Sequence, residues 1–313
     1  MKRILFISVI LLLWNFTLAG PGWALPSLDM SHKQVVVASA TNPTQIYQYM
    51  YINGSYVNTW TSDPIPADGI DGISVGDADN DGVPDITAVV KFAGRGRKFI
   101  KIYMYNSGSE GLPNHIGPDL SKSFSYIRDS IIADVDNDGA NEVVIVGDDT
   151  VAIFRWDGSE FINVWNRSYP DSIFSVDVGD ADTDGANEIV LSPFSIGSPV
   201  ILESLGNDVW EEEEMIEPLP DTSVFIDYAK VRDADNLPGN EIVAGGNNNR
   251  LMIWKYDPEG VYKYDLVFES DDLGGFTQGV DAGDIDGDEL NEVITLDIFG
   301  DNIFRFDYMN GTY

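Results

Sequence analysis

The sequence contains no cysteine and only two histidines among its 313 residues. Without cysteine the chain forms no disulfide and cannot be a lipoprotein, so something else must hold the fold together. Basic residues are also scarce, because 18 Lys and Arg stand against 52 Asp and Glu for a net charge of −34. Such a surface repels nucleic acid and acidic lipids and argues against polyanionic substrates.

Residues typical of catalysis are few. The two histidines, His32 and His115, lie in no Ser or Cys nucleophile motif, and we expect both in exposed loops. The Gly-x-Ser-x-Gly motif is absent, and the short basic stretch 94–98 (Gly-Arg-Gly-Arg-Lys) opens no helix, which indicates a hairpin turn. The sequence therefore predicts no catalytic residues and favours a protein that is not an enzyme.

Long apolar runs are missing beyond the N-terminus. Lys2 and Arg3 give the N-terminus a positive charge, and the apolar residues 4–14 that follow are short for a membrane span. Gly22-Trp23-Ala24 then suits cleavage of a signal peptide. We predict a signal peptide over 1–24, with an uncleaved anchor as the alternative, and one domain over 25–313. The mature protein is then secreted to the extracellular space or cell surface, or to the periplasm of a Gram-negative cell, with no membrane insertion after cleavage.

The most informative feature present is an acidic loop that recurs along the chain. Four nine-residue copies carry carboxylates at positions 1, 3, 5 and 9: Asp77, Asp79, Asp81 and Asp85; Asp134, Asp136, Asp138 and Glu142; Asp180, Asp182, Asp184 and Glu188; and Asp284, Asp286, Asp288 and Glu292.

These carboxylates predict about four calcium sites. Like charges so close together repel strongly unless a cation lies between them, and hard oxygen ligands in a flexible loop with Gly at position 6 suit Ca²⁺. The last copy has Glu289 in place of that Gly. The alternative is a plain acidic turn, since Asp and Gly are ordinary turn residues.

An EF-hand is excluded by the residues that follow the loop. Its position 12 must be a bidentate Glu and its flanks must be helices. Position 12 here is Ala88, Ile145, Leu191 or Thr295, and β-branched runs flank the loops. Each loop therefore joins two strands of a hairpin.

A fifth, degenerate copy covers residues 233–241. It keeps Asp233, Asp235 and Glu241 but has Leu237 where the third Asp stands elsewhere, and its Gly is shifted to 239. We interpret it as a structural turn without a metal ion.

The copies recur about every fifty residues, a period typical of repeat architectures. Between loops the same aromatic strand returns, as Ile153-Phe-Arg-Trp156, Ile253-Trp-Lys-Tyr256 and Ile303-Phe-Arg-Phe306. Four strands per repeat with no helical periodicity predict an all-β fold, a β-propeller of about six four-stranded blades. Three strands (34–38, 45–51 and 56–61) precede the first loop, and the last blade ends where its fourth strand should begin, so we expect a ring that is incomplete at the C-terminus.

Over about residues 34–313 the loops and their spacing resemble the FG-GAP or VCBS repeat family, which includes the propeller of integrin α subunits. The resemblance implies a calcium-stiffened scaffold, often of seven blades, that presents loops to partners. The family's Phe-Gly and Gly-Ala-Pro signatures are absent, which places the chain with divergent microbial members.

Two functions remain open. The first is a non-catalytic interaction or adhesion module with a protein or glycan ligand at its surface. The second is a carbohydrate-active protein, a lectin or a polysaccharide-degrading enzyme, that uses Trp60, Trp165 and Trp210 as sugar platforms. Those tryptophans also recur where core packing is expected, so their exposure distinguishes the two.

Overall fold

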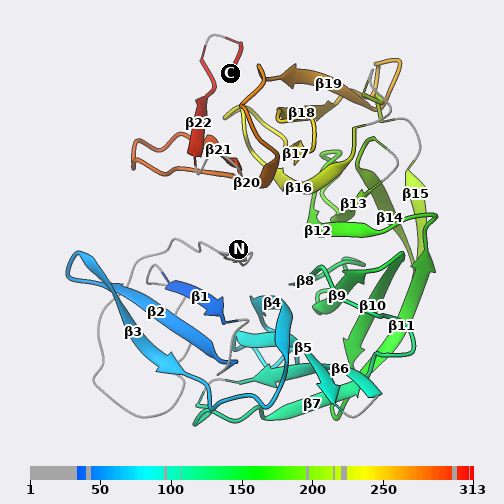
Figure 1. The fold of residues 1–313 in the computed structure, drawn as a ribbon. Helices are drawn as coiled ribbons and strands as arrows, with labels where there is room; N and C mark the ends of the chain where they lie inside the picture. Colours follow the sequence, from blue (N-terminus) through cyan, green and yellow to red (C-terminus); the bar gives the residue numbers. More distant parts are fainter. Residues whose placement is uncertain are drawn as a thin grey trace. The chain divides into compact units, whose positions relative to one another are not determined.

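The structure is a computed structural model that describes residues 34–39, 44–94, 97–106, 108–194, 197–213, 216–219, 224–297, 302–309 and 311–313. The predicted signal peptide 1–24 and His32 lie outside the described residues. All regular elements within the described ranges are β-strands (Figure 1). In these same ranges no helix has the length and apolar character needed to cross a bilayer.

The strands form six antiparallel sheets, each built from consecutive strands. The first three sheets contain β1 (Gln34–Ala38), β2 (Ile46–Ile52) and β3 (Ser55–Thr61); β4 (Gly69–Gly76), β5 (Asp85–Gly94), β6 (Arg97–Tyr105) and β7 (His115–Asp119); and β8 (Asp129–Ala133), β9 (Glu142–Gly147), β10 (Thr150–Trp156) and β11 (Phe161–Ser168).

The last three sheets follow the same order. They contain β12 (Ile173–Gly179), β13 (Glu188–Pro193), β14 (Val200–Gly206) and β15 (Val209–Glu213); β16 (Ile226–Arg232), β17 (Glu241–Gly246), β18 (Leu251–Tyr256) and β19 (Tyr264–Glu269); and β20 (Thr277–Gly283), β21 (Glu292–Asp297) and β22 (Asn302–Asp307).

These sheets are the six blades of a β-propeller, which confirms the predicted fold class. The three strands expected before the first loop are β1 to β3, and every acidic loop joins the first two strands of a blade as predicted. Among the described residues, the first and last sheets have three strands and the other four have four. Sheets built from consecutive antiparallel strands need only short connections, which is why the repeat is visible in the sequence.

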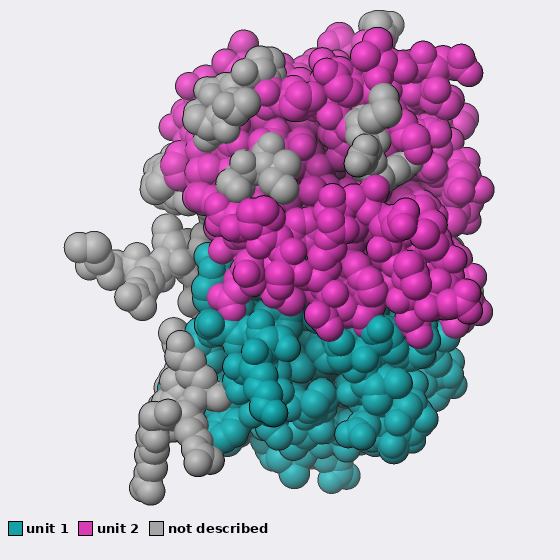
Figure 2. Space-filling view, turned by 90° about the vertical axis from the view of Figure 1, so that its right-hand side faces the viewer, with its two compact units in different colours: residues 1–133, 140–147, 152–164 teal, residues 134–139, 148–151, 165–313 magenta. Residues whose placement is uncertain are grey.

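The chain divides into two compact units, coloured separately in Figure 2. Unit 1 comprises residues 1–133, 140–147 and 152–164, and unit 2 comprises 134–139, 148–151 and 165–313. The boundary between the two units falls within the third sheet, although all six sheets belong to one series of repeats.

The second strand of each acidic hairpin is the most apolar. Strands β9, β13 and β17 are buried at every residue, and their sequences begin with the loop's last Glu and continue as β-branched or apolar runs. A strand that is covered on both faces carries apolar residues continuously, whereas the outer strands β11 and β19 mix buried and exposed positions. The carboxylate at loop position 9 is thereby placed at the edge of the core.

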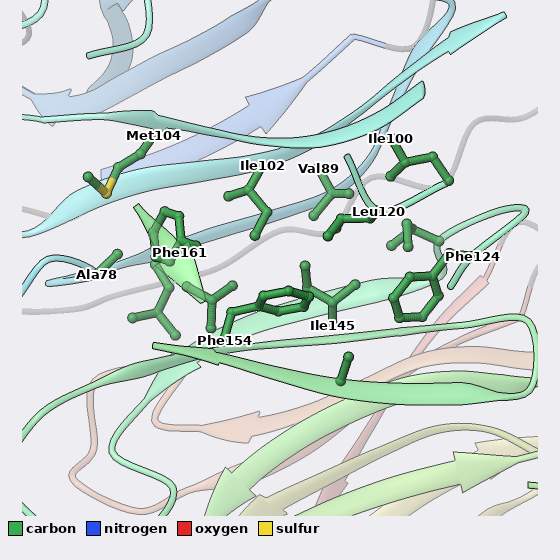
Figure 3. Close-up of a cluster of buried hydrophobic side chains, with 14 residues drawn as sticks. Ala78, Val89, Ile100, Ile102, Met104, Leu120, Phe124, Ile145, Phe154 and Phe161 are labelled. Atoms are coloured by element: carbon green, nitrogen blue, oxygen red, sulfur yellow. The ribbon is translucent and has the colours of Figure 1, made fainter. Parts of the chain in front are cut away.

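Adjacent sheets pack through these strands. In unit 1 one core cluster joins side chains of β5 and β6 to side chains of β9 and β10, including Val89, Ile102, Ile145 and Phe154 (Figure 3). In unit 2 an equivalent cluster contains Trp254, which is fully buried. Each such side chain stabilises the fold by about 1.5–3 kcal/mol relative to its exposed state. The loops are therefore held on blades that apolar packing stabilises without disulfide bonds.

Some glycines are required by close backbone approach. A Cβ on Gly246, at the end of β17, would lie 2.1 Å from the carbonyl oxygen of Phe225, and one on Gly147, at the end of β9, would lie 2.3 Å from that of Tyr126. Gly283, at the end of β20, has nothing within 4 Å of its Cβ position.

We expect Gly246→Ala to lower the free energy of unfolding by about 1–3 kcal/mol or more, because backbone atoms must move apart to admit the methyl group. Gly283→Ala is the matched control and should change stability by less than about 0.5 kcal/mol. Urea denaturation of the two variants measures the difference. Equal midpoints would show that the backbone approach at Gly246 is not tight.

Candidate metal centres

The five acidic loops are numbered here in chain order: loop 1 (77–85), loop 2 (134–142), loop 3 (180–188), loop 4 (233–241) and loop 5 (284–292). Loops 1, 2, 3 and 5 are the predicted calcium loops, and loop 4 is the degenerate copy. Loops 1, 3, 4 and 5 each lie wholly within one compact unit.

Two positions of each loop have left-handed backbone. Position 4 has φ near 60° in Asn80, Asn137 and Asn236, and position 6 has φ of 88° to 92° in the glycines of loops 1 to 3. Asn and Gly tolerate this region best, which explains their recurrence. In loop 5 Glu289 occupies position 6 with φ 72°, and in loop 4 the glycine is displaced to Gly239 with φ 109°. All five loops therefore make the turn, including the two with irregular sequences.

The turn brings three carboxylates of each loop together. Ligand oxygens from positions 1, 3 and 9 lie within 4.8 Å of one another in the groups Asp77, Asp79 and Asp85; Asp134, Asp136 and Glu142; Asp180, Asp182 and Glu188; Asp233, Asp235 and Glu241; and Asp284, Asp286 and Glu292.

The position 5 carboxylates have another contact. Asp81 Oδ1 accepts a hydrogen bond from the N–H of Val83 at 2.9 Å, and Asp184 Oδ1 accepts one from Ala186 at 2.7 Å. Asp288 Oδ1 does the same with Leu290 at 2.9 Å. Each of these side chains fixes its own turn with one oxygen. Asp138 holds the equivalent position in loop 2, and the predicted role of all four as ligands stays a prediction.

The position 1 and position 9 carboxylates are held by backbone donors. Asp77 accepts from the N–H groups of Asp81 and Gly82 at 3.0 and 2.8 Å. Asp85 Oδ2 accepts from Ala78 N at 3.0 Å, and the corresponding bonds end on Oε2 of Glu188, Glu241 and Glu292. A backbone N–H thus fixes one oxygen of the position 9 group in loops 1, 3, 4 and 5.

The partner of the other oxygen at position 9 differs between loops. Asp85 Oδ1 and Glu188 Oε1 are buried without a hydrogen-bond partner, as is Asp180 Oδ1. Burial, with the neighbouring carboxylates, raises the pKa of Asp85 to about 7 and that of Glu188 to about 8. An unpartnered buried carboxylate oxygen costs free energy, so loops 1 and 3 fit a cation that supplies the missing interaction.

In the other loops a basic side chain contacts position 9. Arg155 Nε lies 2.8 Å from Glu142 Oε1, Lys255 Nζ lies 2.6 Å from Glu241 Oε1, and an Arg305 nitrogen lies 3.3 Å from Glu292 Oε1. All three come from the third strand of a blade. Burial alone would lower the pKa of Lys255, but hydrogen bonds to Asp235 and Glu241 outweigh burial and raise it.

Sequence analysis missed a second set of polar residues, the asparagines at positions 4 and 8. Asn141 at position 8 of loop 2 donates from Nδ2 to the carbonyl of Asp77 at 2.9 Å, and its N–H donates to Asn80 Oδ1 at 2.6 Å. The same side-chain bond joins loop 3 to loop 2, loop 4 to loop 3, and loop 5 to loop 4. Adjacent loops are therefore hydrogen-bonded to each other.

A signal for this ladder exists in the sequence. Position 8 is Asn in loops 2 to 5 and Pro84 in loop 1, which has no preceding acidic loop to contact. Position 4 is Thr183 in loop 3, and there the ladder retains the side-chain bond from Asn240 to Asp180 at 2.8 Å.

His115 differs from its expected place. It begins β7, is half-buried, and packs edge-on against Trp156 with ring centroids 4.6 Å apart. The prediction of an exposed loop was wrong, because the apolar face of the ring is covered by an aromatic neighbour.

A sequence profile of the FG-GAP-like repeat family matches residues 134–191, which include loops 2 and 3. This match and the six-bladed β-propeller together fit an FG-GAP repeat propeller. The matched segment runs from the start of loop 2 to the second strand of the next blade, so the family repeat begins at the same loop that the sequence singles out. A comparison with curated proteins finds no match.

Among solved structures the propeller is similar to BBS1N, in a crystal structure of its complex with ARL6DN that was soaked with lead. The TM-score is 0.55 at 14% sequence identity, and the match covers 92% of this chain and 80% of that chain. At this identity the similarity concerns the fold alone.

We expect Asn187→Ala to lower the free energy of unfolding by about 1–2 kcal/mol, because the carbonyl of Asp134 loses its 2.9 Å donor. Asn302→Ala is the control, since the exposed Asn302 makes only a 3.4 Å contact to Asp297. Thermal unfolding of both variants measures the difference in their stability. If the two variants are equally stable, the ladder does not hold the loops together.

Proposed function

We propose that this propeller is a secreted calcium-binding interaction module without catalytic activity. The unpartnered buried oxygens of Asp85 and Glu188 carry the metal part of the proposal, because each completes a cluster of three carboxylates. The FG-GAP-like repeat supports the interaction part, because this type of propeller serves as a protein-interaction fold.

Calcium suits the donor set better than other ions. The donors are all carboxylate oxygens on a flexible turn, and there is no His or Cys in the clusters. Ca²⁺ accepts six to eight oxygen ligands with variable geometry, whereas Zn²⁺ prefers nitrogen and sulfur and Mg²⁺ demands a near-ideal octahedron. Bound calcium would supply positive charge that stiffens each hairpin. The residues proposed to hold it are Asp77, Asp79, Asp81, Asp85, Asp134, Asp136, Asp138, Glu142, Asp180, Asp182, Asp184, Glu188, Asp284, Asp286, Asp288 and Glu292.

The proposed ligand is a protein or glycan met outside the cytoplasm, through the export that the N-terminal sequence predicts. A net charge of −34 disfavours nucleic acid and anionic membranes. The similar fold of BBS1N is seen in complex with ARL6DN, which is consistent with a propeller of this type presenting its surface to another protein.

The tryptophans do not support the carbohydrate-active alternative. Trp60 and Trp210 are 5% and 4% exposed, and their indole N–H groups donate to the carbonyls of Ser109 and Val135 at 3.1 and 3.2 Å. Trp165 is half-buried and packs against Trp210 with ring centroids 5.5 Å apart. Trp60 and Trp210 are parts of the core, and Trp165 is partly covered by Trp210, whereas a sugar platform requires an exposed ring face.

We expect calcium to stabilise the protein measurably. A site with a dissociation constant near 10⁻⁴ M, at the tighter end for extracellular modules, contributes about 1.4 kcal/mol at millimolar calcium. Four sites would approach about 6 kcal/mol, comparable to the stability of a whole domain. The melting temperature should therefore rise strongly when calcium is added to EDTA-treated protein at fixed ionic strength.

Magnesium at the same concentration is the control and should raise the melting temperature less. The variant Asp182→Asn, which weakens loop 3, should bind one ion fewer by calorimetry. A melting temperature that calcium leaves unchanged would contradict the metal part of the proposal.

A further inference from the structure

Loop 4 has a cation of its own. Lys255 lies on β18 and pairs across the sheet with Glu241, the first residue of β17. Its ammonium nitrogen is 2.5 Å from Asp235 Oδ2 and 2.6 Å from Glu241 Oε1. These two acceptors are side chains that are 6% and 0% exposed. The ammonium group of Lys255, whose side chain is 32% exposed, therefore neutralises positions 3 and 9 of the loop at buried partners.

The same place on the third strand is occupied differently in loops 1 and 3. Tyr105 pairs with Ile86, so the next residue, Asn106, stands across from Asp85. Leu202 pairs with Ile189, so Glu203 stands across from Glu188.

These residues have different effects on their loops. Asn106 is neutral and donates one hydrogen bond to Asp79 Oδ2 at 2.7 Å. Glu203 adds a further negative charge near loop 3 and contributes to the raised pKa of Glu188. The loops with unpartnered carboxylate oxygens are those whose third strand has no basic residue across from position 9.

We propose that the ammonium group of Lys255 takes the place of calcium in loop 4, so that this blade is closed by an internal cation. This inference rests on the proposed function only where it compares loop 4 with the loops proposed to bind calcium. Lys255 reaches two of the three clustered carboxylates with a compact charge and three donors. A divalent ion in the same cluster would meet a positive charge a few ångströms away and would have to displace it from buried partners.

Two further features of loop 4 agree with a monovalent occupant. Position 5 is Leu237, whose side chain is half exposed and supplies no oxygen, and position 6 is Pro238. Loop 4 therefore has fewer carboxylates than its neighbours, and the single positive charge of Lys255 suits the smaller negative charge that remains. Leu237, Pro238 and Lys255 are thus three parts of one change, in which a side chain replaces a metal ion.

Loop 5 provides a comparison. Arg305 also contacts positions 3 and 9, with nitrogens 2.8 Å from Asp286 and 3.3 Å from Glu292. However, Asp286 is 41% exposed, and the same guanidinium is shared with the exposed Asp307. Solvent screens such a pair and the side chains can turn away, so Arg305 does not replace an ion as Lys255 does.

The test exchanges the two third-strand residues. Lys255→Asn gives loop 4 the residue of loop 1, Asn106→Lys gives loop 1 the residue of loop 4, and Lys122→Asn, an exposed lysine in a turn, is the control. Amide hydrogen exchange in loops 1, 3 and 4 is measured on the full chain with EDTA and with millimolar calcium, together with calcium stoichiometry by calorimetry.

In the wild type, chelation should speed exchange about tenfold in loops 1 and 3, the factor that one site contributes at this concentration, and leave loop 4 unchanged. Asn106→Lys should make exchange in loop 1 insensitive to EDTA and lower the stoichiometry by one ion. Lys255→Asn should melt below the wild type and the control in EDTA, because Asp235 and Glu241 lose their partner.

Loop 4 exchange that responds to chelation in the wild type as loops 1 and 3 do would overturn the proposal. So would equal melting temperatures of Lys255→Asn and the control in EDTA. If no loop of the wild type responds to calcium, the calcium-binding function fails instead, and the EDTA comparison still decides the role of Lys255. If Lys255→Asn does not fold, the result for loop 1 in Asn106→Lys remains decisive.

Discussion

The structure depends on how negative charge is compensated where the first hairpin of a blade turns. Each turn places three carboxylate oxygens within 4.8 Å, and the position 9 group is buried against the core. Backbone N–H groups satisfy part of this charge through bonds such as Ala78 N to Asp85. The remainder needs a positive charge, because buried carboxylates that are close together cannot all ionise without one.

The loops meet this need in different ways on one backbone. Loops 1 and 3 leave buried oxygens unpartnered, loop 4 pairs with Lys255, and loops 2 and 5 have an arginine near position 9 beside the ion proposed for them. Because asparagines hydrogen-bond neighbouring loops within each unit, one loop is ordered partly by the next.

The sequence predicted most of the fold and the positions of the clusters. Loop spacing predicted the blades, and the β-branched run after Glu142 predicted a strand, since both are local patterns with a known period. The role of Lys255 was not predictable from spacing, because it follows from cross-strand pairing with Glu241. The half-buried state of His115 was mispredicted because it depends on packing against Trp156, which belongs to another sheet.

A crystal structure of the calcium-bound protein, or of a lanthanide derivative measured at the metal's anomalous edge, tests the central claim most directly. The account predicts anomalous peaks among Asp77, Asp79 and Asp85 and among Asp180, Asp182 and Glu188. It predicts the nitrogen of Lys255, and no peak, between Asp235 and Glu241. A metal peak at that place with Lys255 turned outward, or no peak in loops 1 and 3, would contradict it.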